Sequence, residues 1–280
     1  MKKLLTIEFV KYSRSRVFYG FMLLYFALLA LQMLSIGKPD KSSLNLPVIW
    51  GNLVYAVSFF NFFIGLIILI SITNEYQYRT IRQHIVDGMS REQFFLAKYL
   101  YAILLAALTC LFVYGVIVIV GMTHHFDAPV LKMGKDMAQV QALSTNSYHS
   151  IFENSVIIFD YFIQLLGYIS MAVFIGILFR STAIATIFYI IYVMILEPLI
   201  SWVAFHTDST RHLEAYFPKT LFSSVVEPIS VVRMVAMNDG PPFIGLVKGA
   251  PSHQNILILA CVYILIFAGA TYFLIKKRDV

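Results

Sequence analysis

The chain of 280 residues contains little charge: Asp, Glu, Lys and Arg make up 13% of it, about half the ~25% usual in soluble domains. Apolar and aromatic residues make up 59%. A water-soluble core cannot use so much apolar surface, and intrinsic disorder requires low hydrophobicity with high charge. Two cysteines and 14 glycines are too few for a disulfide scaffold or a collagen-like repeat. The composition therefore predicts a polytopic α-helical membrane protein.

Signatures of catalysis are also missing from the sequence. The two Gly-Lys pairs, Gly37-Lys38 and Gly134-Lys135, lack the Ser or Thr that completes a nucleotide-binding loop. The chain has no His-Glu-x-x-His helix, no Gly-x-Ser-x-Gly elbow and no Cys-x-x-Cys pair. We therefore predict no catalytic residue and no cofactor site, and we expect that the chain does not hydrolyse ATP by itself.

Histidine is the residue type that raises the question of a metal site. Most of the histidines fall in the segments that we place outside the cell, where Asp127 and Glu153 are near in sequence. Their spacing matches no standard ligand pattern, so we predict no metal site and keep an external one as the alternative. The outer histidines are His124, His125, His149, His206, His212 and His253.

Six stretches are long and apolar enough to cross a membrane, since ~20 helical residues span the ~30 Å hydrocarbon core. Arg180 and Ser181 alone separate the fourth stretch from the fifth, which predicts a very tight turn. Pro198, directly after Glu197, interrupts the fifth. We predict a single all-α transmembrane domain, 1–280, with spans at 17–36, 53–73, 99–122, 155–179, 181–202 and 255–275.

Lysine and arginine are distributed unevenly between the segments that join these spans. If the N-terminus is cytoplasmic, the inner segments hold 13 of the 21 Lys and Arg residues, although they are about half as long as the outer ones. Both termini should therefore face the cytoplasm across the cell (inner) membrane. The net charge of +6 is then explained by the basic cytoplasmic segments of a membrane protein and does not indicate nucleic-acid binding. Residues 1–16, which are basic and partly amphipathic, predict a helix on the membrane surface.

Two carboxylates fall inside the predicted spans, where an ionisable group usually faces a partner or a wet cavity. Asp160 lies about one turn into the fourth span from the outside, and Glu197 lies near the outer end of the fifth. Both positions are shallow, so we expect interfacial carboxylates reached by water; the alternative is a gate or substrate pathway. That alternative is stronger for Glu197, because Pro198 breaks the local hydrogen bonds. The outer segment 203–254 should hold one or two short helices on or in the membrane.

The segment between the second and third spans, 74–98, predicts a cytoplasmic elbow made of two helices. Apolar residues recur at helical spacing over 75–87. Gly88 is well placed to end this helix in the left-handed conformation. Ser90 then starts a second helix, in which Gln93 completes a capping box, and this helix continues into the third span.

The elbow resembles the first cytoplasmic loop of type 2 ABC transporter permeases, which are export-type membrane subunits. In that family an acidic residue and an aromatic one end the second span, and a Thr-x-Arg, a Gly-x-Ser-Arg, an aromatic residue and a lysine follow. Arg79 is a difference, since many members have Gly there. The matching residues are Glu75-Tyr76, Thr80-Ile81-Arg82, Gly88-Met89-Ser90-Arg91, Phe94 and Lys98. The number of spans, the basic N-terminal helix, the minimal turn and the long outer segment are similar to the family too.

The resemblance implies that two permease subunits, identical or paralogous, pair in the membrane. Each would dock a separate ATP-binding subunit, which binds ATP and Mg²⁺, and the elbow would act as the coupling helix. The outer segment, with Asp160 and Glu197, would form the gate or pathway. The residues implied in coupling are Glu75, Arg79, Arg82, Gly88, Ser90 and Arg91.

Two other kinds of protein stay open when the residues alone are considered. The first is an integral membrane enzyme that acts on lipid, and the second is a membrane anchor within a larger assembly. An enzyme should place several acids, histidines or asparagines at one level of the spans; the only acids within the spans are Asp160 and Glu197, and no histidine lies there. No residue specifies the cargo or the direction of transport.

Overall fold

The computed structural model describes residues 19–20, 23–24, 27, 61–78, 80–81, 86, 88, 90–123, 156–204, 216–226 and 253–277. All regular elements in these ranges are helical. The predicted interfacial helix 1–16 and most of the first span lie outside them. The helices are α4 (Asn61–Gln77), α6 (Arg91–Thr123), α9 (Val156–Phe179), α10 (Thr182–Ile191), the π-helix η2 (Tyr192–Leu196), α11 (Glu197–Ala204), α12 (Pro218–Val226) and α13 (His253–Lys277).

Four helical stretches in the described part are long and apolar enough to cross a membrane. They coincide with the third to sixth predicted spans, at Glu92–Gly115, Ile158–Phe179, Thr182–Ile200 and Gln254–Lys277. The fifth is continuous through α10, η2 and α11, so Pro198 does not end the helix. The 17 residues of α4 cover the later part of the predicted second span and extend beyond it to Gln77. The prediction of a multi-span α-helical membrane protein is confirmed for these helices.

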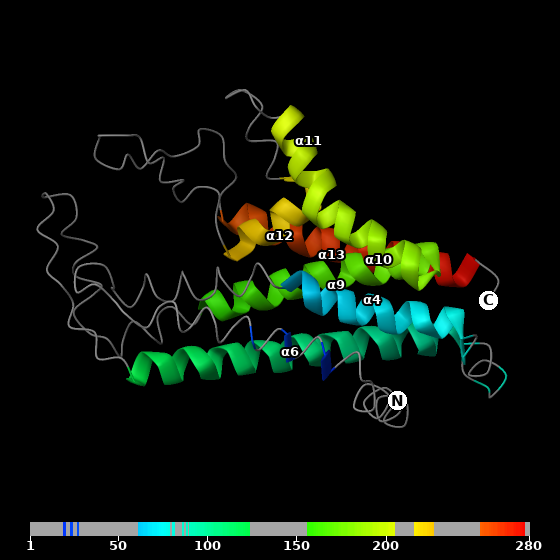
Figure 1. Cartoon of the computed structure of the whole chain (residues 1–280), viewed down its shortest axis with the longest axis horizontal. Helices are drawn as coiled ribbons and strands as arrows, with labels where there is room; N and C mark the ends of the chain where they lie inside the picture. The colour runs from blue at the N-terminus through cyan, green and yellow to red at the C-terminus, as the bar shows by residue number, and fades with distance from the viewer. Residues whose placement is uncertain are drawn as a thin grey trace, which may run out of the picture.

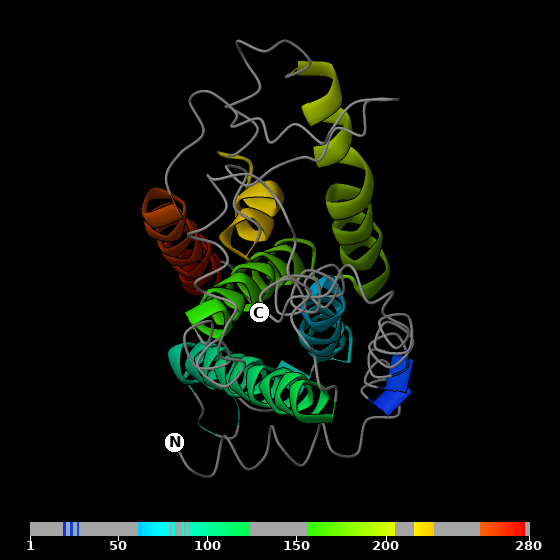
Figure 2. The same cartoon turned by 90° about the vertical axis from the view of Figure 1, so that its left-hand side faces the viewer.

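Helix α9 lies in the middle of the bundle, and α4, α6, α10, α12 and α13 all pack against it (Figures 1 and 2). Of its membrane-length stretch, 72% is buried, against 22% for the fifth span and 17% for α13. Because apolar side chains in a membrane need no shielding from lipid, the exposed faces of the outer helices are suited to lipid or to another membrane subunit.

The core forms two clusters on different faces of α9. Leu165 and Ile169 pack with α4 and α6 in one cluster. Tyr168 and Ala172 pack with α10, α12 and α13 in the other, which also includes residues of α4. Residues four apart on a helix share a face, and an offset of three residues rotates the second pair by only roughly 60° about the axis, so the two clusters occupy neighbouring sides of α9.

Glycines allow two of the close helix crossings. A Cβ at Gly65 of α4 would overlap the Tyr189 hydroxyl of α10, and a Cβ at Gly167 of α9 would overlap the Phe222 ring of α12. Small residues at such positions let membrane helices approach closely and gain van der Waals contact. These two glycines therefore determine how near α10 and α12 lie to the centre of the bundle.

The helix ends gather at two ends of the bundle. At one end, α4 and α9 finish and α6 and α10 begin; we call it the elbow end (Figure 1). The opposite end, where α12 lies, we call the α12 end. Helix α13 runs from the α12 end to the elbow end. Arg180, with a φ of 54°, and Ser181 make the whole connection between α9 and α10, which confirms the predicted tight turn.

Candidate functional site

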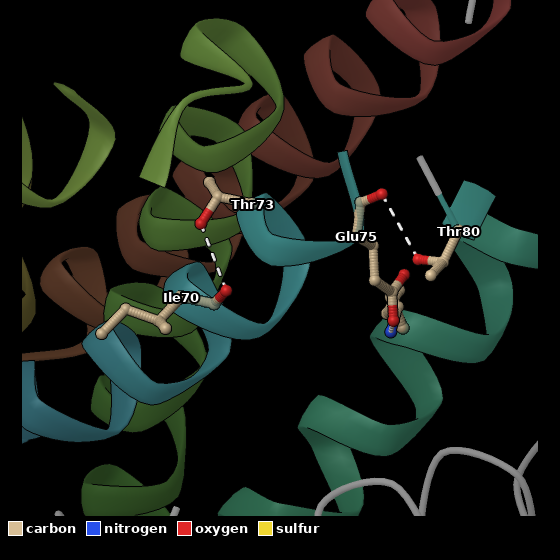
Figure 3. A network of polar contacts seen from close by, with 5 residues as sticks. Ile70, Thr73, Glu75 and Thr80 are labelled. Carbon is tan, nitrogen blue, oxygen red and sulfur yellow. Dashed lines mark hydrogen bonds and ion pairs between the residues drawn. The ribbon is translucent and has the colours of Figure 1, made fainter. Parts of the chain in front are cut away.

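A buried ion pair joins the two helices on either side of the predicted elbow. Glu75 lies in the last turn of α4 and Lys98 lies early in α6, with 2.5 Å between Lys98 Nζ and Glu75 Oε1. Their side chains are 1% and 3% exposed. Just beyond α4, the Thr80 hydroxyl donates to the Glu75 carbonyl at 3.3 Å (Figure 3). Since either charge alone would be expensive to bury, the pair fixes the end of α4 against the beginning of α6.

The second half of the elbow shows the predicted capping geometry. Gly88 has a φ of +92°, a conformation that residues with a Cβ rarely adopt. The Ser90 N–H donates to Gln93 Oε1 at 3.0 Å, and the Gln93 N–H donates to Ser90 Oγ at 3.2 Å. This reciprocal pair is a capping box, and α6 continues from it as one helix of 33 residues. The exit of the elbow is thus attached directly to the third span.

The residues implied in coupling differ in their placement. Gly88 and Ser90 are exposed, whereas Glu75 is buried and belongs to α4, although the elbow helix was expected to begin there. The Glu75 carboxylate is thereby directed at Lys98 and not at solvent. The other three have side chains outside the described part of the chain: Arg79, Arg82 and Arg91.

Polar contacts also tie the beginning of the fifth span to the end of α4. The Thr182 hydroxyl lies 3.0 Å from Asn74 Oδ1 and 2.9 Å from Gln77 Oε1. The Arg180 guanidinium lies over the Tyr76 ring, 5.4 Å from its centroid. Sequence reasoning missed these contacts, because the partners are more than 100 residues apart.

Helix α13 is joined to α6 at the same end. The Tyr272 hydroxyl donates to Glu92 Oε1 at 2.6 Å, next to the capping box. Lys276 and Lys277 follow in the last turn of α13 and are exposed. At the elbow end, therefore, polar contacts join the helix ends to one another, and positively charged side chains are exposed.

The carboxylate of Glu197 lies at the α12 end and binds the first turn of α12. Its Oε2 accepts the Lys219 N–H at 3.0 Å, and its Oε1 accepts the Thr220 N–H at 2.5 Å. The residue is 1% exposed, and Asp160 is 6% exposed. The expectation that water reaches both carboxylates is wrong: for Glu197, a helix terminus takes the place of solvent. The predicted short helix in the outer segment is present as α12.

A third polar cluster lies between α4 and α9, within the membrane-spanning length. The Tyr161 hydroxyl donates to Asn61 Oδ1 at 2.6 Å, and Asn61 Nδ2 donates to Gln164 Oε1 at 3.1 Å. All three side chains are fully buried. Tyr161 and Gln164 are three residues apart on α9, but Asn61 of α4 is at least 100 residues away from both, so sequence reasoning missed this cluster.

The described residues contain no group of three His, Cys, Asp or Glu side chains that could hold a metal ion. This statement does not cover the outer histidines of the sequence prediction, whose side chains all lie outside the described part. Of the two cysteines, Cys110 is buried and Cys261 is exposed, and both are free thiols.

One comparison with known proteins matches most of the chain. Residues 4–197 match the family described as ABC-2 family transporter protein. The chain belongs to the ABC-2 transporter family. No curated protein matches it. The matched residues of this ABC-2 family protein include the elbow and end at Glu197, so α12 and α13 lie beyond the match.

Membership and structure agree on the class of protein. A membrane transporter family and four membrane-length helices support a multi-pass permease subunit of an ABC transporter. Among the alternatives, membership counts against a membrane enzyme with its own catalytic site. The resemblance noted from the elbow motif is therefore confirmed at the level of the family.

Proposed function

We propose that this ABC-2 family protein is the permease subunit of an ATP-driven exporter in the cell (inner) membrane, with both termini in the cytoplasm. A separate ATP-binding subunit would bind ATP and Mg²⁺, and its movement would open an outward route for cargo. The elbow between α4 and α6 would be the docking element.

The observation that carries this proposal is the way in which the elbow is held. A docking element transmits movement only if it is rigidly joined to the helices it moves. Here the buried Glu75–Lys98 pair closes the base of the elbow, and the Ser90–Gln93 capping box joins its exit to a 33-residue helix. A force on the elbow would therefore shift α4 and α6 together and not be lost in a loose loop.

The exposed apolar faces are compatible with pairing with a second permease in the membrane. Ile187, Ile195 and Leu199 on the fifth span are 57%, 55% and 50% exposed. In α13, Leu265 is 70% exposed. Such faces accommodate either lipid or another permease, identical or paralogous, by van der Waals packing.

The test is a pull-down of the tagged full-length chain in mild detergent from its native membranes, followed by an ATPase assay and mass spectrometry. We expect an ATP-binding cassette protein to co-purify with ATPase activity. Arg82→Glu and Arg91→Glu should each reduce its recovery at least about tenfold, since they reverse charge on the proposed docking surface. Lys276→Glu is the matched control: the same charge reversal is made at the elbow end but outside the elbow, and recovery should be unchanged.

Two results would count against the proposal. A chain that purifies alone, under conditions that keep other ABC complexes intact, would favour the membrane anchor. Equal losses in all three variants would show that general charge at the membrane surface, and not the elbow, holds the partner.

A further inference from the structure

Glu197 caps a helix that begins 21 residues after it in the chain. The N–H groups in the first turn of any α-helix have no partner within that helix. In α12 those of Lys219 and Thr220, its second and third residues, are bound by the two carboxylate oxygens of Glu197. The negative charge also suits the positive end of the helix dipole. One side chain of the fifth span thus accepts hydrogen bonds from two N–H groups in the first turn of α12.

A wide helical turn directs Glu197 towards α12. Ala185, Tyr189, Val193 and Glu197 are all buried and are spaced four residues apart. In a regular α-helix this spacing drifts by roughly 40° per step, so Glu197 would be rotated roughly 120° away from Ala185. The π-helical turn η2 (Tyr192–Leu196) contains Val193 and ends directly before Glu197, and its wider turn reduces the drift over the last step of this row. The same turn leaves Glu197 on the inner face.

The remaining contacts hold the side of α12 and the chain just before it. Leu221, Phe222 and Val225 are fully buried, and the Phe222 ring sits over Gly167 of α9. The Tyr263 hydroxyl of α13 donates to the Tyr216 carbonyl at 3.0 Å. Hydrogen bonds to Glu197 are directional, unlike apolar contacts, so a small displacement of α11 would break both while the apolar side remained packed.

We propose that Glu197 is a positioning residue of the transport cycle: its carboxylate holds α12 closed over the α12 end of the bundle, and its release accompanies opening of the outward route. This inference rests on the proposed function and adds to it the contact that is regulated. Tyr168 of α9 and Tyr192 of the fifth span lie close enough to Glu197 to interact with its charge.

The first experiment measures amide hydrogen exchange by mass spectrometry on the full-length chain in detergent. In Glu197→Ala, peptides that contain 218–226 should exchange at least about tenfold faster than in the unaltered chain, equivalent to about 1.4 kcal/mol of lost protection. Glu197→Gln keeps an accepting oxygen and should show a smaller increase. Glu92→Gln is the control, since it removes a carboxylate that accepts one hydrogen bond at the other end, and should leave α12 unchanged.

The second experiment uses the complex with its co-purified ATPase. Trapping it with Mg·ATP and vanadate should raise exchange of α12 in the unaltered chain, and should raise it no further in Glu197→Ala. A purely structural role predicts that nucleotide leaves the exchange of α12 in the unaltered chain unchanged.

The outcomes separate the two proposals. Equal α12 exchange in Glu197→Ala and the unaltered chain would overturn the positioning role. If α9 also exchanges fast in Glu197→Ala, that variant has lost its fold, and the proposal is then tested with Glu197→Gln. Unchanged α12 exchange in Glu197→Gln would overturn the positioning role. An active complex whose α12 does not respond to nucleotide would overturn the gating step. Absence of any ATPase would overturn the proposed function instead, while the first experiment still tests the contact.

Discussion

Removing one member of the buried pair of Glu75 and Lys98 should cost more stability than breaking any other polar contact at the elbow end. Lys98→Met removes the positive charge at nearly constant side-chain length and leaves Glu75 buried with its main partner gone. Breaking a buried pair in this way costs about 3–5 kcal/mol, whereas replacing both members by neutral groups is often close to neutral. We therefore expect Lys98→Met to lower the free energy of unfolding by about 3 kcal/mol, and the double variant Glu75→Gln/Lys98→Met to recover most of that loss.

The assay is unfolding by sodium dodecyl sulfate in mixed micelles, followed by circular dichroism, for both single variants and the double variant. The coupling free energy from this cycle should be about 2 kcal/mol or more. Glu92 and Tyr272 provide the matched cycle, because they form an exposed hydrogen bond at the same end. Glu92→Gln with Tyr272→Phe should show a coupling below about 1 kcal/mol.

Salt gives an independent check on the same reasoning. Ions screen exposed charges at a Debye length of ~10 Å in 0.1 M salt, but they screen a buried pair much less. The coupling of Glu75 with Lys98 should therefore stay constant between low and high salt. If the effects of the two single substitutions simply add, within about 0.5 kcal/mol, the pair does not hold the base of the elbow.

Three glycine substitutions, two of them with a comparison variant, test the packing and backbone of the bundle by the same unfolding assay. Gly65→Ala should destabilise by about 1–3 kcal/mol through overpacking, and Tyr189→Phe in the same chain should relieve part of that loss by removing the overlapping hydroxyl. Gly167→Ala should destabilise by a similar amount because an aromatic ring of α12 covers it, whereas Gly269→Ala, with open space around its Cβ position, should be neutral or slightly stabilising. Gly88→Ala should cost about 1–2 kcal/mol, since its φ of +92° strains a residue with a Cβ, and equal stability of this variant would refute the left-handed turn.

Features that depend on neighbouring residues could be read from the sequence. The third to sixth spans follow from local hydropathy, and the Ser90–Gln93 capping box follows from residue types three apart. The short connection at Arg180 follows from counting, since two adjacent spans leave no room for a longer one. In each case the physical cause acts within a few residues, so the linear pattern contains it.

Features that depend on which helix faces which could not be read in this way. The partner of Glu75 lies 23 residues away, and Glu197 binds backbone groups of a helix that is outside its own span. A carboxylate near the end of a span looks the same in sequence whether water, a lysine or a helix terminus meets it. The sequence alone therefore predicts that water solvates Glu197, although the fold supplies its carboxylate with backbone N–H donors.

Glu75 and Glu197 lie at opposite ends of the bundle, on helices that contact each other. This arrangement suggests the order in which a movement would pass from one end to the other. Glu75 holds the end of α4 at the elbow, and Asn74 and Gln77 in the same turns meet the hydroxyl of Thr182, where the fifth span begins. The fifth span then packs against α4 and α9 through α10, and Glu197 near its other end binds the first turn of α12. A displacement of α4 by a docked subunit would reach the fifth span first at Thr182. The π-helical turn η2, directly before Glu197, is the part of the fifth span that departs from regular α-helical geometry. The contact with α12, formed by one side chain just beyond that turn, would be the first at the α12 end to respond, because apolar packing tolerates small shifts that two directional hydrogen bonds do not.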